Sequence, residues 1–159
     1  EQNLKEELHT LARELDLTET EAPDGSAATV WFTEERGRQV DMISHLGRLA
    51  DLIVVPQPDK AARLGANTLK AAIFSSGRPV MMCPDQAASA VIGGHIAIGW
   101  NGSIEASRAM RMSMPVIRKA DKVSILTTKD ADIHSANASD LRRLLNMHGV
   151  ATELSCLVS

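Results

Sequence analysis

The sequence predicts an α/β fold, doubly wound, in which a mostly parallel sheet carries helices on both faces. Segments with the pattern of a strand and segments with the pattern of a helix alternate along the whole chain. The strand segments 51–56, 79–84, 94–100 and 122–128 lack clean polar alternation, as strands buried on both sides do. With 159 residues, the chain is long enough for one ordinary domain with a full core.

The helical segments are marked by apolar residues that recur every three or four positions, as Leu4, Leu8, Leu11 and Leu15 do. We expect helices over 4–15, 40–50, 66–76, 103–119 and 138–149. We expect strands over 28–34, 51–56, 79–84, 94–100, 122–128 and 151–158, and a polar turn over 18–27. In the helix 103–119, the spacing of Met110, Met114 and Ile117 places all three on the core side.

Composition excludes several classes of partner. The formal net charge of −3 gives no basic field for nucleic acid or for an anionic membrane surface. Aromatic residues make up only 3% of the chain, and no apolar run approaches the ~18 residues that span a bilayer. The two cysteines have no C-x-x-C spacing, which favours a reduced, cytoplasmic setting. The chain begins at Glu1 without a leader, and we interpret it as a fragment of a longer product.

The stretch 96–107, IAIGWNGSIEAS, changes period at a polar turn between a strand and a helix. Such a turn offers unpaired backbone N–H groups and the positive end of the helix dipole to an anion. Gly102 permits close approach of the backbone, and the Ser103 hydroxyl caps the helix or donates to a phosphate. The same residues are also ordinary turn-and-cap chemistry, so both interpretations stay open.

Three motifs in order carry a resemblance to a known family: Trp100-Asn101-Gly102-Ser103, the Glu-Ala-x-x-Ala of 105–109, and the Ala-Asp-x-Val of 120–123. Together they resemble the first βαβ unit of the universal stress protein family. The earlier segment 50–84 is similar to the closing half of the same domain. The resemblance therefore implies a tandem arrangement: residues 1–85 as the back half of a first domain, 86–93 as a linker, and 94–159 as the front half of a second.

The sequence leaves two arrangements of these halves open. In the first, each half is completed by further residues of a longer chain. In the second, the two halves assemble together as one permuted domain, because the equivalents of a fourth, fifth, first, second and third strand are all present.

The resemblance also implies a ligand site at strand ends. We expect it to draw on Gly99, Trp100, Asn101, Gly102, Ser103, Thr127, Gly65 and Asn67. Nucleotide-binding members of the family have an acidic residue where Asn101 stands, and glycines where Pro56 and Asp59 stand. Prolines lack an N–H donor and an aspartate repels phosphate, so a complete ATP site is not expected within these residues.

The function expected from the resemblance is a non-catalytic stress-response or regulatory module. It would act through pairing of domains, as a dimer or an intramolecular pseudo-dimer, by way of the strand region Pro79 to Pro84, and through a small anionic ligand. The alternative is an adenine-nucleotide-binding protein, for ATP or AMP, with switch or slow ATPase behaviour. No catalytic triad and no spacing of metal ligands is evident in the sequence.

Overall fold

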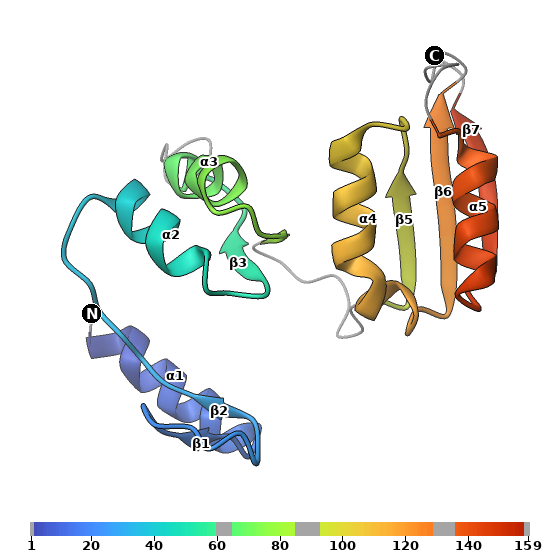
Figure 1. Cartoon of the computed structure of the whole chain (residues 1–159). Helices are drawn as coiled ribbons and strands as arrows, with labels where there is room; N and C mark the ends of the chain where they lie inside the picture. The colour runs from blue at the N-terminus through green and yellow to red at the C-terminus, as the bar shows by residue number, and fades with distance from the viewer. Residues whose placement is uncertain (1, 60–64, 85–92, 129–135, 158–159) are drawn as a thin grey trace. The chain divides into compact units, whose positions relative to one another are not determined.

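The computed structural model of the chain describes residues 2–59, 65–84, 93–128 and 136–157. The chain divides into two compact units, Glu1–Arg38 and Gln39–Ser159 (Figure 1). The linker predicted at 86–93 lies outside the described residues, apart from Gly93. Within the described ranges, no helix has both the length and the apolar character needed to cross a membrane.

The first unit consists of one helix and one small sheet. The helix α1 (Gln2–Glu14) is followed by β1 (Thr18–Glu19) and β2 (Thr29–Val30), which pair in parallel. Ala12 of α1 is buried, whereas Leu4 and Leu11 of the helix and Leu15 just after it are more than half exposed. A side-chain contact joins the helix to the sheet, because His9 Nδ1 lies 2.5 Å from Glu19 Oε2.

Two predictions for this unit are wrong in their bounds. The strand expected over 28–34 is limited to Thr29–Val30, and part of the turn expected over 18–27 is strand β1. The length of each strand is limited by its pairing, because a strand extends only where a neighbouring strand accepts its hydrogen bonds. The Thr20 N–H donates to Val30 O over 3.1 Å, and Trp31, the next residue, is 54% exposed.

The second unit begins with a helix–strand–helix–strand segment. It contains α2 (Gln39–Gly47), β3 (Ile53–Pro56), α3 (Ala66–Ser75) and β4 (Val80–Cys83), and β3 pairs with β4 in parallel. Gly47 lets α2 approach β3 closely, because a Cβ at this position would lie 2.8 Å from Ile53 Cδ1. Buried residues from β3 and α3 fill the space between helices and sheet: Val55, Ala71 and Ala72.

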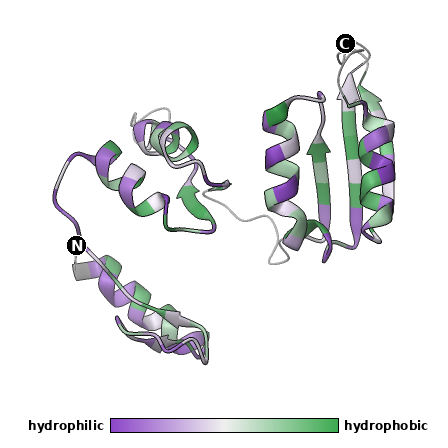
Figure 2. Cartoon of the chain, in the orientation of Figure 1, coloured by the Kyte–Doolittle hydropathy of each residue, from purple (hydrophilic) through white to green (hydrophobic). Residues whose placement is uncertain are grey.

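The remaining elements form a three-stranded parallel sheet in the order β5-β6-β7. The strands are β5 (His95–Gly99), β6 (Lys122–Thr128) and β7 (Thr152–Leu157), and they alternate with α4 (Ile104–Ile117) and α5 (Ala138–Met147). Figure 2 shows hydrophobic residues along most of β5 and β6. The α/β fold with parallel sheets is therefore confirmed.

Both helices contribute to one core against a single face of this sheet. Its buried members come from α4, α5 and β6 and from the residues just after β5 and α5: Trp100, Met110, Ile117, Val123, Ile125, Ala138, Leu141, Leu145 and Val150. Met114 packs against the same cluster, so the predicted core side of α4 is confirmed. Alternation along the strands places Ile96 and Ile98 on this face.

The opposite face of the sheet carries small and polar residues. His95, Ala97 and Gly99 are exposed there, alternating with Ile96 and Ile98. Cross-strand polar contacts link this face: His95 Nε2 lies 2.9 Å from Ser124 Oγ, and Lys122 Nζ lies 2.8 Å from Glu153 Oε2. The hydrogen bond and the positive charge of Lys122 hold the pKa of Glu153 below its ordinary value.

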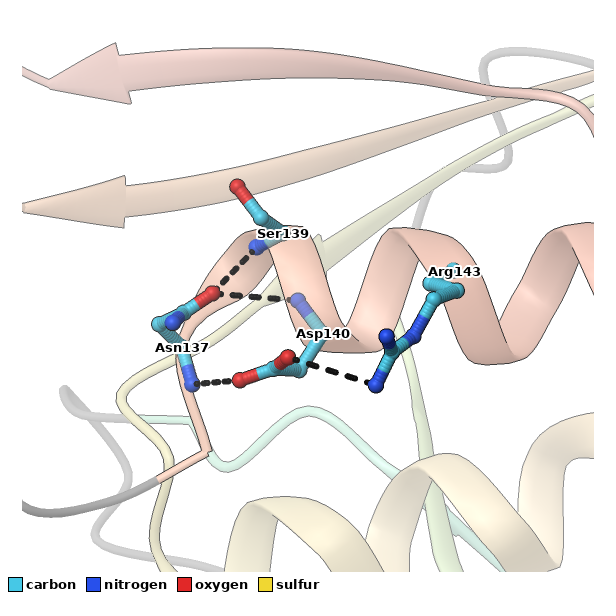
Figure 3. Close-up of polar contacts among 4 residues, drawn as sticks. All are labelled: Asn137, Ser139, Asp140 and Arg143. Carbon is cyan, nitrogen blue, oxygen red and sulfur yellow. Dashed lines mark hydrogen bonds and ion pairs between the residues drawn. The ribbon is translucent and has the colours of Figure 1, made fainter.

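The start of α5 shows how side chains fix an element boundary. Asn137 Oδ1 accepts hydrogen bonds from the N–H groups of Ser139 and Asp140, at 2.9 and 3.0 Å (Figure 3). The Asp140 carboxylate accepts the Asn137 N–H in return, which completes a capping box. Arg143 adds a longer contact of 3.9 Å to the same carboxylate. These bonds satisfy donors that the helix itself leaves free.

Candidate functional site

The strand-end cavity lies where β5, β6 and β7 finish. Because the three strands are parallel, their carboxyl ends meet at one edge of the sheet, and the first turn of α4 begins beside them. The cavity has a volume of about 540 Å³. It is lined by residues from all three strands and from the start of α4: Gly99, Trp100, Asn101, Ser103, Glu105, Ala106, Leu126, Thr127, Thr128 and Leu157.

Trp100 holds the turn in place. Its side chain is only 6% exposed and belongs to the core. The indole Nε1 donates a hydrogen bond of 2.8 Å to the carbonyl oxygen of Ala136, just before α5, and its backbone N–H donates to Leu126 O over 2.8 Å. The turn that follows β5 is therefore fixed both to the neighbouring strand and to the start of the next helix.

The side-chain oxygens of the turn Asn101–Ser103 form hydrogen bonds with nearby backbone N–H groups. Asn101 Oδ1 accepts the backbone N–H of Ser103 at 3.1 Å, and Ser103 Oγ accepts the N–H of Ala106 at 3.1 Å. Gly102 has a φ of 76°, in the left-handed region that side chains with a Cβ avoid. The turn-and-cap interpretation of these residues is thus confirmed, and the side-chain oxygens of Asn101 and Ser103 are already engaged with the backbone.

The charge around the cavity is mixed. The N-terminus of α4 supplies partial positive charge, and Thr127 and Thr128 supply hydroxyl groups that donate or accept. Glu105, in the first turn of α4, contributes a carboxylate to the same lining. The arrangement suits a ligand that presents an anionic or acceptor group to the helix terminus and a donor to Glu105.

Of the eight residues predicted for the site, five line the cavity: Gly99, Trp100, Asn101, Ser103 and Thr127. Gly102 forms the turn between Asn101 and Ser103. Gly65 and Asn67 lie at the start of α3, in the segment that follows β3, and they are not among the described residues that line this cavity.

Gly65 has a structural role of its own. Its φ is 80°, and a Cβ added there would lie 3.4 Å from Pro58 Cα. Its carbonyl accepts the N–H of Leu69 at 3.0 Å, so Gly65 turns the chain into the first turn of α3.

Sequence reasoning missed five residues of the lining: Glu105, Ala106, Leu126, Thr128 and Leu157. The register that sets Thr128 level with Leu157 brings β7 to the cavity, and that register follows from the packing of the sheet. For Glu105 and Ala106 the signal was available, because residues in the first turn of a helix lie beside the loop that precedes it.

No group of three or more His, Cys, Asp or Glu side chains in the described ranges is placed to hold a metal ion. In the first unit, a second open cavity of about 580 Å³ is lined by polar and charged side chains of α1 and β1: Glu6, His9, Thr10, Arg13 and Glu19. Charges of both signs lie side by side there, as on an ordinary solvated surface.

Comparison with known proteins assigns no family. No protein-family model matches the chain, and no curated protein matches it. A solved structure that does match is a Leishmania major Friedlin protein assigned as an aspartate carbamoyltransferase, with 14% identity over 95% of this chain. The present chain spans 61% of the length of that protein, and the TM-score is 0.29. A score of this size carries no argument about family or function, so the α/β assignment rests on the strands and helices described above.

Proposed function

We propose that the chain is part of a universal stress protein-like, non-catalytic regulatory module that binds a small ligand at the strand-end cavity and acts through pairing of domains. The observation that carries the proposal is the cavity itself, at the carboxyl edge of a parallel sheet and at the N-terminus of α4. Its walls include most of the turn that carries the family resemblance, Trp100 to Ser103.

The cavity chemistry supports an anionic ligand that also carries hydroxyl groups. Backbone N–H groups at a helix start favour an anion. The Glu105 carboxylate accepts hydrogen bonds only, and it therefore favours a donor such as a sugar hydroxyl. A sugar phosphate or a nucleotide has both features.

Pairing of domains is supported by the outer edge of β4. Ile53 N donates to Pro79 O and Gln57 N donates to Cys83 O, so the backbone groups of alternate residues, Val80 and Met82, point away from β3. The Met82 side chain is 49% exposed. In the described part of the chain no strand pairs with this edge, and an apolar open edge of this kind recruits a partner strand or surface. We therefore assign pairing to the region Pro79 to Pro84.

Adenine-nucleotide binding is the second candidate, and the size of the cavity favours it. Sites for small molecules have volumes of about 300–1,000 Å³, and the strand-end cavity falls within that range. AMP or ATP would supply the phosphate, the ribose hydroxyls and an apolar base in one molecule. Switch behaviour would follow if the nucleotide binds one paired state more tightly than the other.

Thermal unfolding of the full chain with AMP, ATP, adenosine or inorganic phosphate tests the ligand. A ligand present at ~100 times its Kd stabilises the folded chain by roughly 2.7 kcal/mol. Thr127→Val removes a hydroxyl from the cavity and should reduce the shift, whereas Thr152→Val, the same change outside the lining, should leave it intact. Stabilisation by AMP and ATP selects the nucleotide candidate, and no shift at millimolar concentration of any probe contradicts a ligand role.

Pairing is tested separately by sedimentation of the same chain over a range of concentrations. Met82→Lys places a charge on the outer edge of β4 and should shift the equilibrium toward monomer. Leu49→Lys, at an exposed position in the turn after α2, is the matched control. A chain that is monomeric at every concentration contradicts pairing of separate chains.

A further inference from the structure

In the described part of the chain, four strands of the second unit have one edge without a neighbour: β3, β4, β5 and β7. β3 is paired with β4 only, and β5 is paired with β6 only. A two-stranded parallel sheet is not stable by itself, and parallel sheets are normally buried on both faces. We propose that the open edges of β3 and β5 pair with each other in parallel, so that the strands form one sheet in the order β4-β3-β5-β6-β7.

The hydrogen-bond pattern shows which groups are available on each edge. On β3, Ile53 and Gln57 donate to β4, so the N–H and C=O of Val54 point outward. On β5, the Trp100 N–H donates to β6 and Gly94 O accepts from it, so His95, Ala97 and Gly99 point outward. Both edges therefore present donors and acceptors at alternate residues.

Parallel pairing fits these groups in one register. Val54, placed level with Ile96, would donate to His95 O and accept from the Ala97 N–H. Below and above, the His95 N–H would donate to Leu52 O, and the Gly99 N–H to Pro56 O. Pro56 has no N–H, which leaves only the top of the ladder short of one donor.

The same register covers the exposed faces of both sheets. On β3, Ile53 faces α2 at Gly47, and Val54, on the opposite face, is 58% exposed. On β5, Ile96 faces the core under α4, and Ala97 is exposed. Residues that are level in a sheet share a face, so Val54 would continue the face under α4, and Ala97 would continue the face under α2 and α3.

Antiparallel pairing gives the opposite result. The outward-pointing residues Val54 and Ala97 would then be level and share one face. All four helices would lie on the other face, and the exposed residues of β3 and β5 would stay uncovered. Burial of apolar surface therefore favours the parallel arrangement.

The handedness of the connections agrees with this arrangement. Crossovers between parallel strands are right-handed in almost all known cases. From the boundary between β3 and β5, the connection through α3 runs outward to β4, and the connection through α4 runs outward in the opposite direction to β6. Right-handed crossovers in opposite directions place their helices on opposite faces, and the boundary becomes the switch point of the sheet.

The length of the connection favours pairing within one chain over pairing with a second copy. Eleven residues, 84–94, connect β4 to β5 and reach at most ~36 Å. The path from the end of β4 to the start of β5 needs roughly 13 Å along the strands and about 10 Å across two strand spacings. The connection is long enough, and a short tether keeps the two edges at millimolar effective concentration.

Disulfide cross-linking tests the register. In a chain with Cys83→Ser and Cys156→Ser, the pair Val54→Cys with Ile96→Cys would place two cysteines level on one face, with Cα atoms about 4.8 Å apart, within disulfide range. The matched control, Val54→Cys with Ala97→Cys, places them on opposite faces. With oxidised glutathione, we expect at least ~10-fold more intrachain disulfide in the first pair. Equal yields, an excess in the control, or disulfides only between chains would overturn the proposal.

Hydrogen exchange of the unaltered chain gives a second test that requires no variant. If β3 and β5 pair, the outward amides of Val54, Ala97 and Gly99 should exchange at least ~10-fold more slowly than unpaired amides. The Ile125 amide, in the central strand of a sheet already described, is the internal reference. Free exchange at the three outward amides, with Ile125 protected, contradicts the pairing.

Discussion

The indole of Trp100 and the carbonyl of Ala136, 36 residues apart in the sequence, are joined by a hydrogen bond of 2.8 Å. The bond connects the turn at the strand-end cavity to the start of α5. Since Trp100 also belongs to the core, one side chain supports both the packing of the sheet and the shape of the cavity.

Replacing this indole tests that connection. Trp100→Phe keeps an aromatic ring and removes the donor, which leaves Ala136 O without its hydrogen bond. We expect a loss of about 1–3 kcal/mol in the free energy of unfolding, measured by urea denaturation. Trp31→Phe, at a position that is 54% exposed, is the control, and it should change stability by less than ~0.5 kcal/mol. Equal effects of the two substitutions would contradict a structural role for the Trp100 bond.

The two helix caps should differ in strength. Asn137→Ala removes an acceptor of two N–H groups and one half of the capping box, and we expect a loss of roughly 1–2 kcal/mol. Ser103→Ala removes a single accepted bond, from the Ala106 N–H, and should cost about 0.5–1 kcal/mol. Urea denaturation of both variants checks the order. A larger loss at Ser103 would show that its hydroxyl does more than cap α4.

At Thr152 we expect a substitution to increase the free energy of unfolding. Its Oγ1 is buried, and no partner is found for it within the described part of the chain. Thr152→Val keeps the shape and removes the unpaired hydroxyl, so we expect a gain of about 1 kcal/mol. Thr152→Ser, which keeps the hydroxyl and loses the methyl group, should be destabilising. If the valine variant is less stable than the parent, the hydroxyl has a partner that these contacts do not include.

Glu153 predicts a dependence of stability on pH. The hydrogen bond and charge of Lys122 lower the pKa of this carboxyl in the folded chain. A lowered folded-state pKa contributes stability that is present above the ordinary value of 4.5 and is lost as the pH falls through the folded pKa. The contribution should be small, because both side chains are about half exposed or more and the pair is screened by salt.

Lys122→Met isolates this contribution. The variant should lose less Tm than the parent when the pH is lowered from 7 to 3, and the difference should shrink in high salt. Lys119→Met, which removes a lysine from the turn between α4 and β6, is the matched control. Identical pH profiles of the parent and Lys122→Met would show that the ion pair contributes nothing in solution.

The sequence predicted the central elements best. The strand 122–128 is observed with the expected bounds, because it is rich in β-branched residues and its middle residues are buried in the central strand of a parallel sheet. The helices begin within two residues of their predicted starts, where residues such as Ser103 and Asn137 cap them. The short strands β1 and β2 were predicted poorly, since their extent depends on pairing and not on local pattern.

The sequence identified mainly the part of the candidate site that the turn after β5 contributes. Gly99 to Ser103 are consecutive, so one motif identifies them all. Thr128 and Leu157 come to the cavity through the register of β6 against β7, which no local pattern contains. The role of Asn101 became clear only from the structure, in which its side-chain oxygen accepts a hydrogen bond from the Ser103 N–H.

The placement of the two tryptophans has a spectroscopic consequence. Trp100 is buried beside the cavity, and Trp31 is half exposed in the other unit. In a Trp31→Phe chain the single remaining indole would emit from the wall of the candidate site, at short wavelength while the core is intact. Its emission would then report on the occupancy of the cavity and on the unfolding of the surrounding sheet, with no attached dye.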